Sequence, residues 1–355
     1  MSEPSAADVT DVTTLVDLAA ERVGGQALAA SDEFFAEKEN LLRAAAPIFV
    51  DGKYTDRGKW MDGWESRRSF GRVEGHTHDW CIVKLGLRGV VAGVDVDTRF
   101  FKGNFPESAS IEACDLPGDP PVAALLDPSV RWREILPPTK LHGDASNPFA
   151  VASLDARGLA TGAPSTHLRL KIFPDGGVAR LRVYGTVVPD WRALRRFGDV
   201  HDLASVEHGG AVVACNDMFF GSRHNLIMPG RSVNMGDGWE TRRKRVPGSD
   251  WAIVRLGARA TKLRVIEVDT NHFKGNSPES CLLEALDDDG APTAALPARG
   301  WRPLLARTKL RPHTRHFFDD ALVQPAGVTH VRLTIFPDGG VSRLRVHGET
   351  DEGAR

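Results

Sequence analysis

Alternating apolar and polar positions recur near the end of each half of the chain. Leu168, Leu170 and Ile172 alternate with polar residues, and this run ends in the turn-forming sequence Pro174-Asp175-Gly176-Gly177. A second alternating run follows the turn, so the pattern predicts a β-hairpin with one face toward a core. The same pattern returns at 331–346.

Two other runs, 80–85 and 251–256, are apolar on both faces, as expected for central strands of a sandwich. Helical periodicity is scarce. The segment 31–46 could form a helix, but its match in the second half contains Gly221 and Pro229, which favours an ordered loop. Short strands separated by Gly- and Pro-rich turns predict an all-β fold with a jelly-roll β-sandwich in each half.

The two halves repeat each other over most of their length. The segment 97–108 matches 269–280 at nine of twelve positions, and Gly-Trp-Glu-(Ser/Thr)-Arg-Arg occurs at 63–68 and 238–243. Repeats this large indicate duplicated domains. We predict an N-terminal tail (1–14), a first jelly-roll repeat (15–186), a linker (187–199), a second repeat (200–348) and a C-terminal tail (349–355).

Length and composition fit this organisation, because 355 residues with 41% hydrophobic and 26% charged content suit two globular domains. A net charge of -2 gives no basic face for nucleic acid, so no nucleic-acid partner is predicted. No run approaches the ~20 apolar residues of a membrane span, and the N-terminus lacks an apolar signal core. We expect a cytoplasmic protein whose four cysteines, which form no C-x-x-C pair, are buried free thiols.

The loop at 269–280 is the first candidate for chemistry. Its side chains include Asp269, Asn271, His272 and Lys274. Histidine transfers protons near neutral pH, and a nearby Asp can hold its tautomer. The positions shared by both copies also suit backbone turns. Asn271 and His272, which replace Arg99-Phe100 of the first copy, are therefore the stronger functional candidates.

The repeated Trp-Glu-Arg block is the second candidate. A guanidinium can grip a carboxylate through two hydrogen bonds, and a Glu can accept from an amide or ureido N–H. The alternative is a Trp that closes the end of the sandwich, with Glu–Arg pairs on the surface. With the neighbouring loop of the first copy, the candidate residues for catalysis or substrate binding are Trp239, Glu240, Arg242, Arg243, Glu65, Arg67, Asp97 and Lys102.

Metal ligands are weakly indicated. His76 and His78 have an i, i+2 spacing, but no carboxylate or cysteine cluster stands in register with them, so a solvated loop is the preferred interpretation. No metal ligand or cofactor is predicted, and metal dependence stays an open alternative. Walker, G-x-S-x-G and H-E-x-x-H motifs are absent from the sequence, which removes several enzyme classes.

Several blocks together resemble the allantoicase family, from about Asp17 to Gly348. They are the starts at 31–35 and 216–220, the Gly-Trp-Glu-(Ser/Thr)-Arg-Arg blocks, Asp-Thr-Asn-His-Phe-Lys-Gly-Asn at 269–276, and the twin Ile-Phe-Pro-Asp-Gly-Gly-Val sequences. The resemblance implies two tandem jelly rolls similar to galactose-binding and discoidin modules, often assembled as a homo-oligomer. It also implies a hydrolase of linear amidines that converts allantoate, a small molecule of purine and allantoin degradation, to (S)-ureidoglycolate and urea.

This activity suggests roles for the candidate residues. Arginines of the repeated block would hold the substrate carboxylate, and Glu240 and Asn271 would orient ureido groups. His272, oriented by Asp269, would act as acid or base, and Lys274 would stabilise negative charge. The competing hypothesis is a non-catalytic carbohydrate- or small-ligand-binding protein, because fold alone does not grant chemistry.

Overall fold

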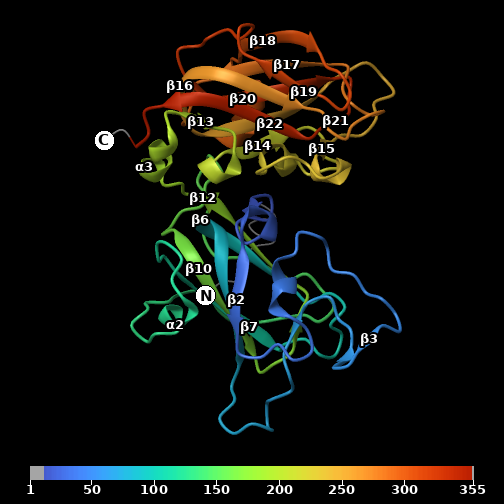
Figure 1. Cartoon of the computed structure of the whole chain (residues 1–355), viewed down its shortest axis with the longest axis vertical. Coiled ribbons are helices and arrows are strands. Elements are labelled where there is room, and N and C mark those ends of the chain that lie inside the picture. Colours follow the sequence, from blue (N-terminus) through green and yellow to red (C-terminus); the bar gives the residue numbers. More distant parts are fainter. Residues whose placement is uncertain (1–11, 354–355) are drawn as a thin grey trace. The chain divides into compact units, whose positions relative to one another are not determined.

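The protein is described by a computed structural model that covers residues 12–353 (Figure 1). The chain divides into two compact units. The first holds the chain up to Asp155 together with Leu159–Val188, and the second holds Ala156–Gly158 together with the chain from Pro189 onward. Each unit contains one eight-stranded sheet system, so the predicted all-β architecture of two tandem sandwiches is confirmed.

In the first unit the strands follow the order β1-β12-β6-β10-β7-β8, and β2 and β9 also pair with β6. The strands are β1 (Val16–Asp17), β2 (Gln26–Ala30), β3 (Tyr54–Thr55), β4 (Gly58–Lys59), β5 (Trp64–Glu65), β6 (Asp79–Asp97), β7 (Ser108–Cys114), β8 (Arg133–Lys140), β9 (Pro148–Ala150), β10 (Ser165–Phe173), β11 (Gly177–Val178) and β12 (Arg180–Val187). The short helices are η1 (Glu21–Val23), η2 (Lys38–Leu42) and α2 (Val122–Leu125).

The second unit repeats this order as β13-β22-β16-β20-β17-β18, with β14 and β19 on β16. The strands are β13 (Val200–Asp202), β14 (Ala211–Cys215), β15 (Trp239–Glu240), β16 (Asp250–Asp269), β17 (Ser280–Leu286), β18 (Arg302–Lys309), β19 (Arg315–Phe318), β20 (Val328–Phe336), β21 (Gly340–Val341) and β22 (Arg343–Thr350). The helices are α3 (Trp191–Leu194), η3 (Arg195–Phe197), η4 (Val206–His208), η5 (Arg223–Ile227), η6 (Met235–Asp237) and η7 (Thr293–Ala298).

The predicted hairpin between the last two long strands of each repeat is wrong. In the first unit β10 pairs with the first half of β6, and β12 pairs with its second half. The turn residues between them are not a hairpin loop, because Gly177 and Val178 form β11 and pair with Glu65 and Trp64 of β5. The repeated Pro-Asp-Gly-Gly sequence therefore anchors the Trp-Glu segment, and the Gly177 N–H also donates to the Asn104 carbonyl oxygen in the loop 97–108.

A buried aromatic ring explains the second glycine of that sequence. Phe101, which belongs to the first copy of the polar loop (97–108), is fully buried, and a Cβ on Gly177 would lie 2.1 Å or less from two of its ring atoms. Gly340 and Phe273 repeat this contact in the second unit. Glycine is required because only a bare backbone can approach the ring so closely.

Three of the four cysteines, at positions 81, 114 and 281, are buried free thiols, and Cys215 is partly exposed. Within residues 12–353, no helix is long and apolar enough to cross a membrane.

Candidate active site

A carboxyl group and an amide come together at the end of the first sandwich. Glu65 is held on β5 by backbone pairing with β11 and by hydrogen bonds with Phe35 and Ala36. Its Oε1 accepts a hydrogen bond from Nδ2 of Asn104 in the polar loop, at 2.7 Å. Burial raises the pKa of the Glu65 carboxyl, although Asn104 and the charge of Arg68 oppose this shift. The carboxyl is therefore better able to hold a proton than a solvated Glu.

This pair lies in a cleft of ≈ 810 Å³. The lining residues are Phe35, Phe49, Asp51, Lys59, Met61, Glu65, Phe100, Lys102, Gly103 and Asn104. Apolar walls with a few converging polar groups are typical of small-molecule sites. Glu65 of the repeated block and Asn104 of the repeated loop, two separate candidate segments in the sequence, thus line the same cleft.

Two ammonium groups line this cleft together with the Asp51 carboxylate. Nζ of Lys59 lies 4.6 Å from the ring centre of Phe49, which in turn stacks on Phe100 with 6.0 Å between ring centres. Lys102 is 79% exposed and its Nζ lies 3.8 Å from the carboxylate of Asp144, so its charge is accessible to a ligand. The cleft therefore places two ammonium groups near the Glu65 carboxyl, whose pKa is raised by burial.

The second unit contains the same polar pair without the same walls. Nδ2 of Asn276 donates a hydrogen bond to Oε1 of Glu240. Lys274, two residues before Asn276, is exposed to solvent. The segment before the Trp-Glu strand is shorter, with nine residues at 228–236 where the first unit has nineteen at 43–61. Phe49 and Lys59 therefore lie in the longer segment of the first repeat, which has a ten-residue extension over its counterpart.

His272 is oriented by partners other than Asp269. Its Nε2 lies 2.9 Å from the carbonyl oxygen of Ser232, and its backbone N–H donates to Nδ1 of His313 at 2.8 Å. Asp269 is used differently, because its Oδ1 accepts from the backbone N–H of Asn271. The expected Asp269–His272 hydrogen bond is therefore replaced by contacts with two other loops.

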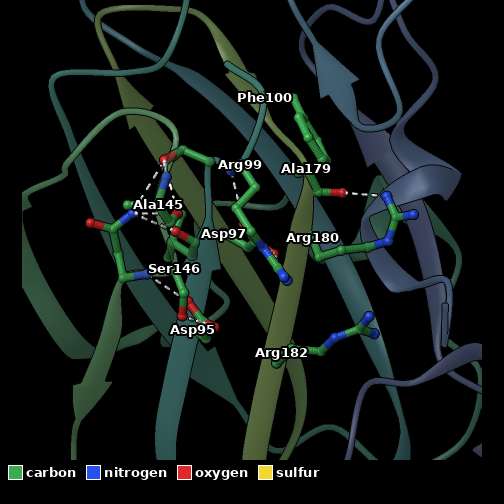
Figure 2. Close-up of polar contacts among 12 residues, drawn as sticks. Asp95, Asp97, Arg99, Phe100, Ala145, Ser146, Ala179, Arg180 and Arg182 are labelled. Carbon is green, nitrogen blue, oxygen red and sulfur yellow. Dashed lines mark hydrogen bonds and ion pairs between the residues drawn. The ribbon is translucent and has the colours of Figure 1, made fainter. Parts of the chain in front are cut away.

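Asp97 is the first-unit counterpart of Asp269, and it is closed off by its own loop. The Arg99 guanidinium forms a two-pronged ion pair with the Asp97 carboxylate, which is 1% exposed (Figure 2). In the second unit Asp269 instead lines a separate pocket. Asp97 and Asp269 therefore do not join the Glu65 cleft or its counterpart.

The tryptophans of the repeated block close the sandwich. Trp64 and Trp239 are fully buried, and their indole N–H groups donate to the carbonyl oxygens of Asp32 and Asp217. Trp239 cannot contact a substrate, so we remove it from the substrate-binding set. The alternative interpretation of the motif, a Trp plug, is the correct one for this residue.

The arginines of the block lie on the surface. Arg67 pairs with Asp32 at 2.7 Å, and Arg242 lies over the Phe219 ring at 4.4 Å. Arg243 is exposed. Arg68 pairs with Asp175 and donates to the carbonyl oxygen of Gly103, so it positions the loop that carries Asn104.

No group of three or more His, Cys, Asp or Glu residues that could hold a metal ion occurs between residues 12 and 353. His76 and His78 make separate contacts: Nε2 of His76 with the Pro174 carbonyl oxygen, and Nδ1 of His78 with the Thr77 hydroxyl.

Sequence reasoning missed Phe49, Lys59 and Asn104 as site residues. Asn104 was visible as part of the Lys-Gly-Asn sequence kept in both copies, but this pattern equally suits a turn. The only signal for Phe49 and Lys59 was the greater length of the first copy.

The sequence and the structure of the chain are both similar to those of allantoicases. A family model described as the allantoicase repeat matches residues 16–188 and again 201–351. The chain is 48% identical to probable allantoicase 1 of Burkholderia mallei, across 99% of both chains. It is 46% identical to the allantoicase of Dictyostelium discoideum, across 95% of this chain and 87% of the other. The crystal structure of the Saccharomyces cerevisiae allantoicase superposes with a TM-score of 0.79 at 35% identity, across 98% and 99% of the two chains.

Proposed function

Since this chain belongs to the allantoicase family, we propose that its reaction, the hydrolysis of allantoate to (S)-ureidoglycolate and urea, takes place in the Glu65 cleft of the first unit. Allantoate carries one carboxylate and two ureido groups on a single carbon. The cleft offers chemistry for each part, with ammonium groups at Lys59 and Lys102 for the carboxylate and polar acceptors and donors at Glu65 and Asn104 for a ureido group.

Glu65 is the proposed proton carrier. In the reaction the bond between the central carbon and one ureido nitrogen breaks, and a bond to the oxygen of water forms. Protonated Glu65 gives its proton to the departing nitrogen, so that urea leaves neutral, and the resulting carboxylate recovers a proton from the attacking water. Burial of Glu65 favours this role because it raises the pKa of the carboxyl group.

The observation that carries this assignment is the Glu65–Asn104 hydrogen bond inside a cleft with two ammonium groups. The second unit has Glu240, Asn276 and Lys274, but its short loop lacks the counterparts of Phe49 and Lys59. We therefore propose that the first unit is the principal site. Glu240 and Lys274, with His272, form the second candidate site.

Matched substitutions test the assignment. Glu65→Gln keeps the size of the side chain and removes the acidic carboxyl proton, so urea release should fall by ~10²-fold or more. Glu240→Gln should change it only a few-fold. Near-normal turnover of Glu65→Gln would remove Glu65 from the mechanism. Equal losses in both variants would show that both units act.

We further propose that the protein works as a homo-oligomer in the cytoplasm. Phe219 and Phe220 are 59% and 61% exposed, and apolar rings at such exposure often mark contact surfaces. The buried free thiols of Cys81, Cys114 and Cys281 suit a reducing compartment. Sedimentation equilibrium tests the first statement, since a purely monomeric species would contradict it; cell fractionation tests the second.

A further inference from the structure

A second pocket, of ≈ 310 Å³, lies in the second unit around Asp269. We call it the Asp269 pocket, and its charged lining includes Asp202, Arg231, Glu267, Asp269, Arg315 and Arg345. It is separate from the Glu240–Asn276 pair, which does not line it. Neither the proposed reaction nor the family comparison gives it a role.

In the first unit an arginine side chain occupies the position that corresponds to the Asp269 pocket. There Arg99 extends its guanidinium over Asp97, with Nε 2.8 Å from Oδ2 and 3.0 Å from Oδ1 (Figure 2). The neighbouring Asp95 is satisfied by the Ser146 hydroxyl and the Asn147 backbone N–H. Every acidic group at this position of the first unit therefore has an internal donor.

The second unit lacks the internal guanidinium because Asn271 replaces Arg99. The Asp269 side chain is 1% exposed, and its Oδ1 accepts from the Asn271 backbone N–H at 2.8 Å. Among the described residues, no group donates a hydrogen bond to its Oδ2. This second carboxylate oxygen faces the pocket, where a donor from a ligand or from water can complete it.

Both arginines and carboxylates surround this acceptor. Arg315 forms two bonds of 2.6 and 2.8 Å to Glu267, and Arg345 donates to the Met228 and Gly230 carbonyl oxygens. Arg231 is exposed at the rim, close enough to interact electrostatically with Asp269. The pocket thus combines one buried acceptor with an arginine at its rim, Arg231, whose charge can hold an anion.

From this arrangement we propose that the Asp269 pocket is a second small-molecule site, for a ligand with a planar amidino, guanidino or ureido head next to a carboxylate. The head takes the place that Arg99 fills in the first unit and donates to Asp269. The carboxylate lies toward Arg231 and Arg315. This site goes beyond the proposed hydrolysis and does not depend on it.

Isothermal titration of the full chain with guanidinoacetate tests the proposal. Asn271→Arg restores the guanidinium of the first unit and should fill the pocket, so the affinity for guanidinoacetate should fall at least about tenfold. The matched control is Asn234→Arg, which adds the same charge at an exposed position of the same unit. It should bind as the parent does.

Asp269→Asn provides a second test in case the Asn271→Arg variant misfolds. It keeps the size of the Asp269 side chain and removes only its charge. It should also lose at least about tenfold in affinity. Unchanged binding in both pocket variants would overturn the proposal. Binding lost in Glu65→Gln but kept in Asn271→Arg would place guanidinoacetate in the Glu65 cleft and would overturn it as well.

Discussion

The pKa of the Glu65 carboxyl is set by opposing influences. Burial raises its pKa, while the Asn104 N–H and the charge of Arg68 lower it, and burial dominates. The protonated form is the proposed catalytic one, so activity is present below this pKa and is lost as pH rises through it.

Asn104→Ala therefore has a predictable effect on the pH profile. Removing the donor to the carboxylate should raise the pKa of Glu65 further, so the alkaline limb of kcat should move to higher pH. Steady-state urea release between pH 5 and pH 9 measures this shift. The same substitution at Asn276 is the control and should leave the limb in place. A shift to lower pH in Asn104→Ala would contradict the general-acid role.

The candidate residues differ in how far sequence could place them. Glu65 and Lys102 were both identified as candidates from their repeated motifs, and the structure places them in one cleft. The surroundings of His272 could not be predicted, since its partners Ser232 and His313 lie 40 and 41 positions away and depend on loop geometry. The sequence shows that Asn271 stands where the first copy has Arg99. Only the structure shows that the Arg99 guanidinium covers Asp97, whereas Asp269 lines an open pocket.

Among the elements, strand β12 carries a buried arginine that organises the neighbouring loop. Arg180 is 1% exposed, pairs with Asp62 Oδ2 at 2.7 Å and donates to the Ala45 and Asp62 carbonyl oxygens. Arg180→Met should lower the free energy of unfolding by ~3–5 kcal/mol, because Asp62 would be left buried beside an apolar chain. Urea denaturation measures this loss.

The exposed pair at Arg67 gives the control for this substitution. Arg67 pairs with Asp32 at 2.7 Å but is 62% exposed, so Arg67→Ala should cost less than ~1 kcal/mol. Similar losses in the two variants would show that Arg180 is not a special structural anchor.

Strand β20 contains a histidine that makes stability sensitive to acid. Burial lowers the pKa of His330 from 6.5 to about 4, and its side chain is 3% exposed. Unfolded chains bind the proton first as pH falls. The stability that His330 contributes is therefore complete above about pH 6.5 and is lost progressively toward pH 4.

The expected loss for His330 across this range is up to about 3 kcal/mol. His330→Gln should flatten the dependence of the melting temperature on pH between 7 and 4.5, as measured by calorimetry. If the melting temperatures of the parent and the variant fall by the same amount between pH 7 and 4.5, the acid sensitivity comes from other groups. His167 on β10 is the matching position of the first unit, and burial lowers its pKa too.

Strand positions were predictable from alternation, but strand partners were not. The runs at β10 and β12 were assigned correctly as strands and wrongly as a hairpin. Alternation reports which face of a strand is buried, and it says nothing about which neighbour lies beside it. Here the 19-residue strand β6 lies between the two in the sheet order, because each pairs with a different half of it.

For the whole molecule, duplication preserved the scaffold and changed the loops. The buried tryptophans Trp64 and Trp239, the buried arginines Arg180 and Arg343, and the Glu–Asn hydrogen bonds occur in both units. The ten-residue extension occurs only in the first unit, and the open Asp269 pocket occurs where Arg99 is absent. Function commonly diverges in this way, at loops carried by a rigid framework.

A loop exchange separates the contribution of the extension from that of the scaffold. Replacing residues 43–61 by residues 228–236 removes Phe49, Asp51, Lys59 and Met61 from the cleft while Glu65 and Asn104 stay in place. If the extension positions allantoate, kcat/KM should fall by ~10²-fold or more, because a misplaced substrate loses the benefit of orientation. Urea release gives the rate, and circular dichroism checks that the sandwich is intact.

The reverse exchange, with residues 43–61 placed in the second unit, controls for damage by the splice itself. It should leave the first-unit cleft active, because that cleft keeps all of its lining residues. Full activity after loss of the first-unit extension would show that Glu65 and Asn104 act without these walls. The two units would then be equivalent at their Glu–Asn pairs, and the reaction could no longer be assigned to the first unit on the basis of its longer loop.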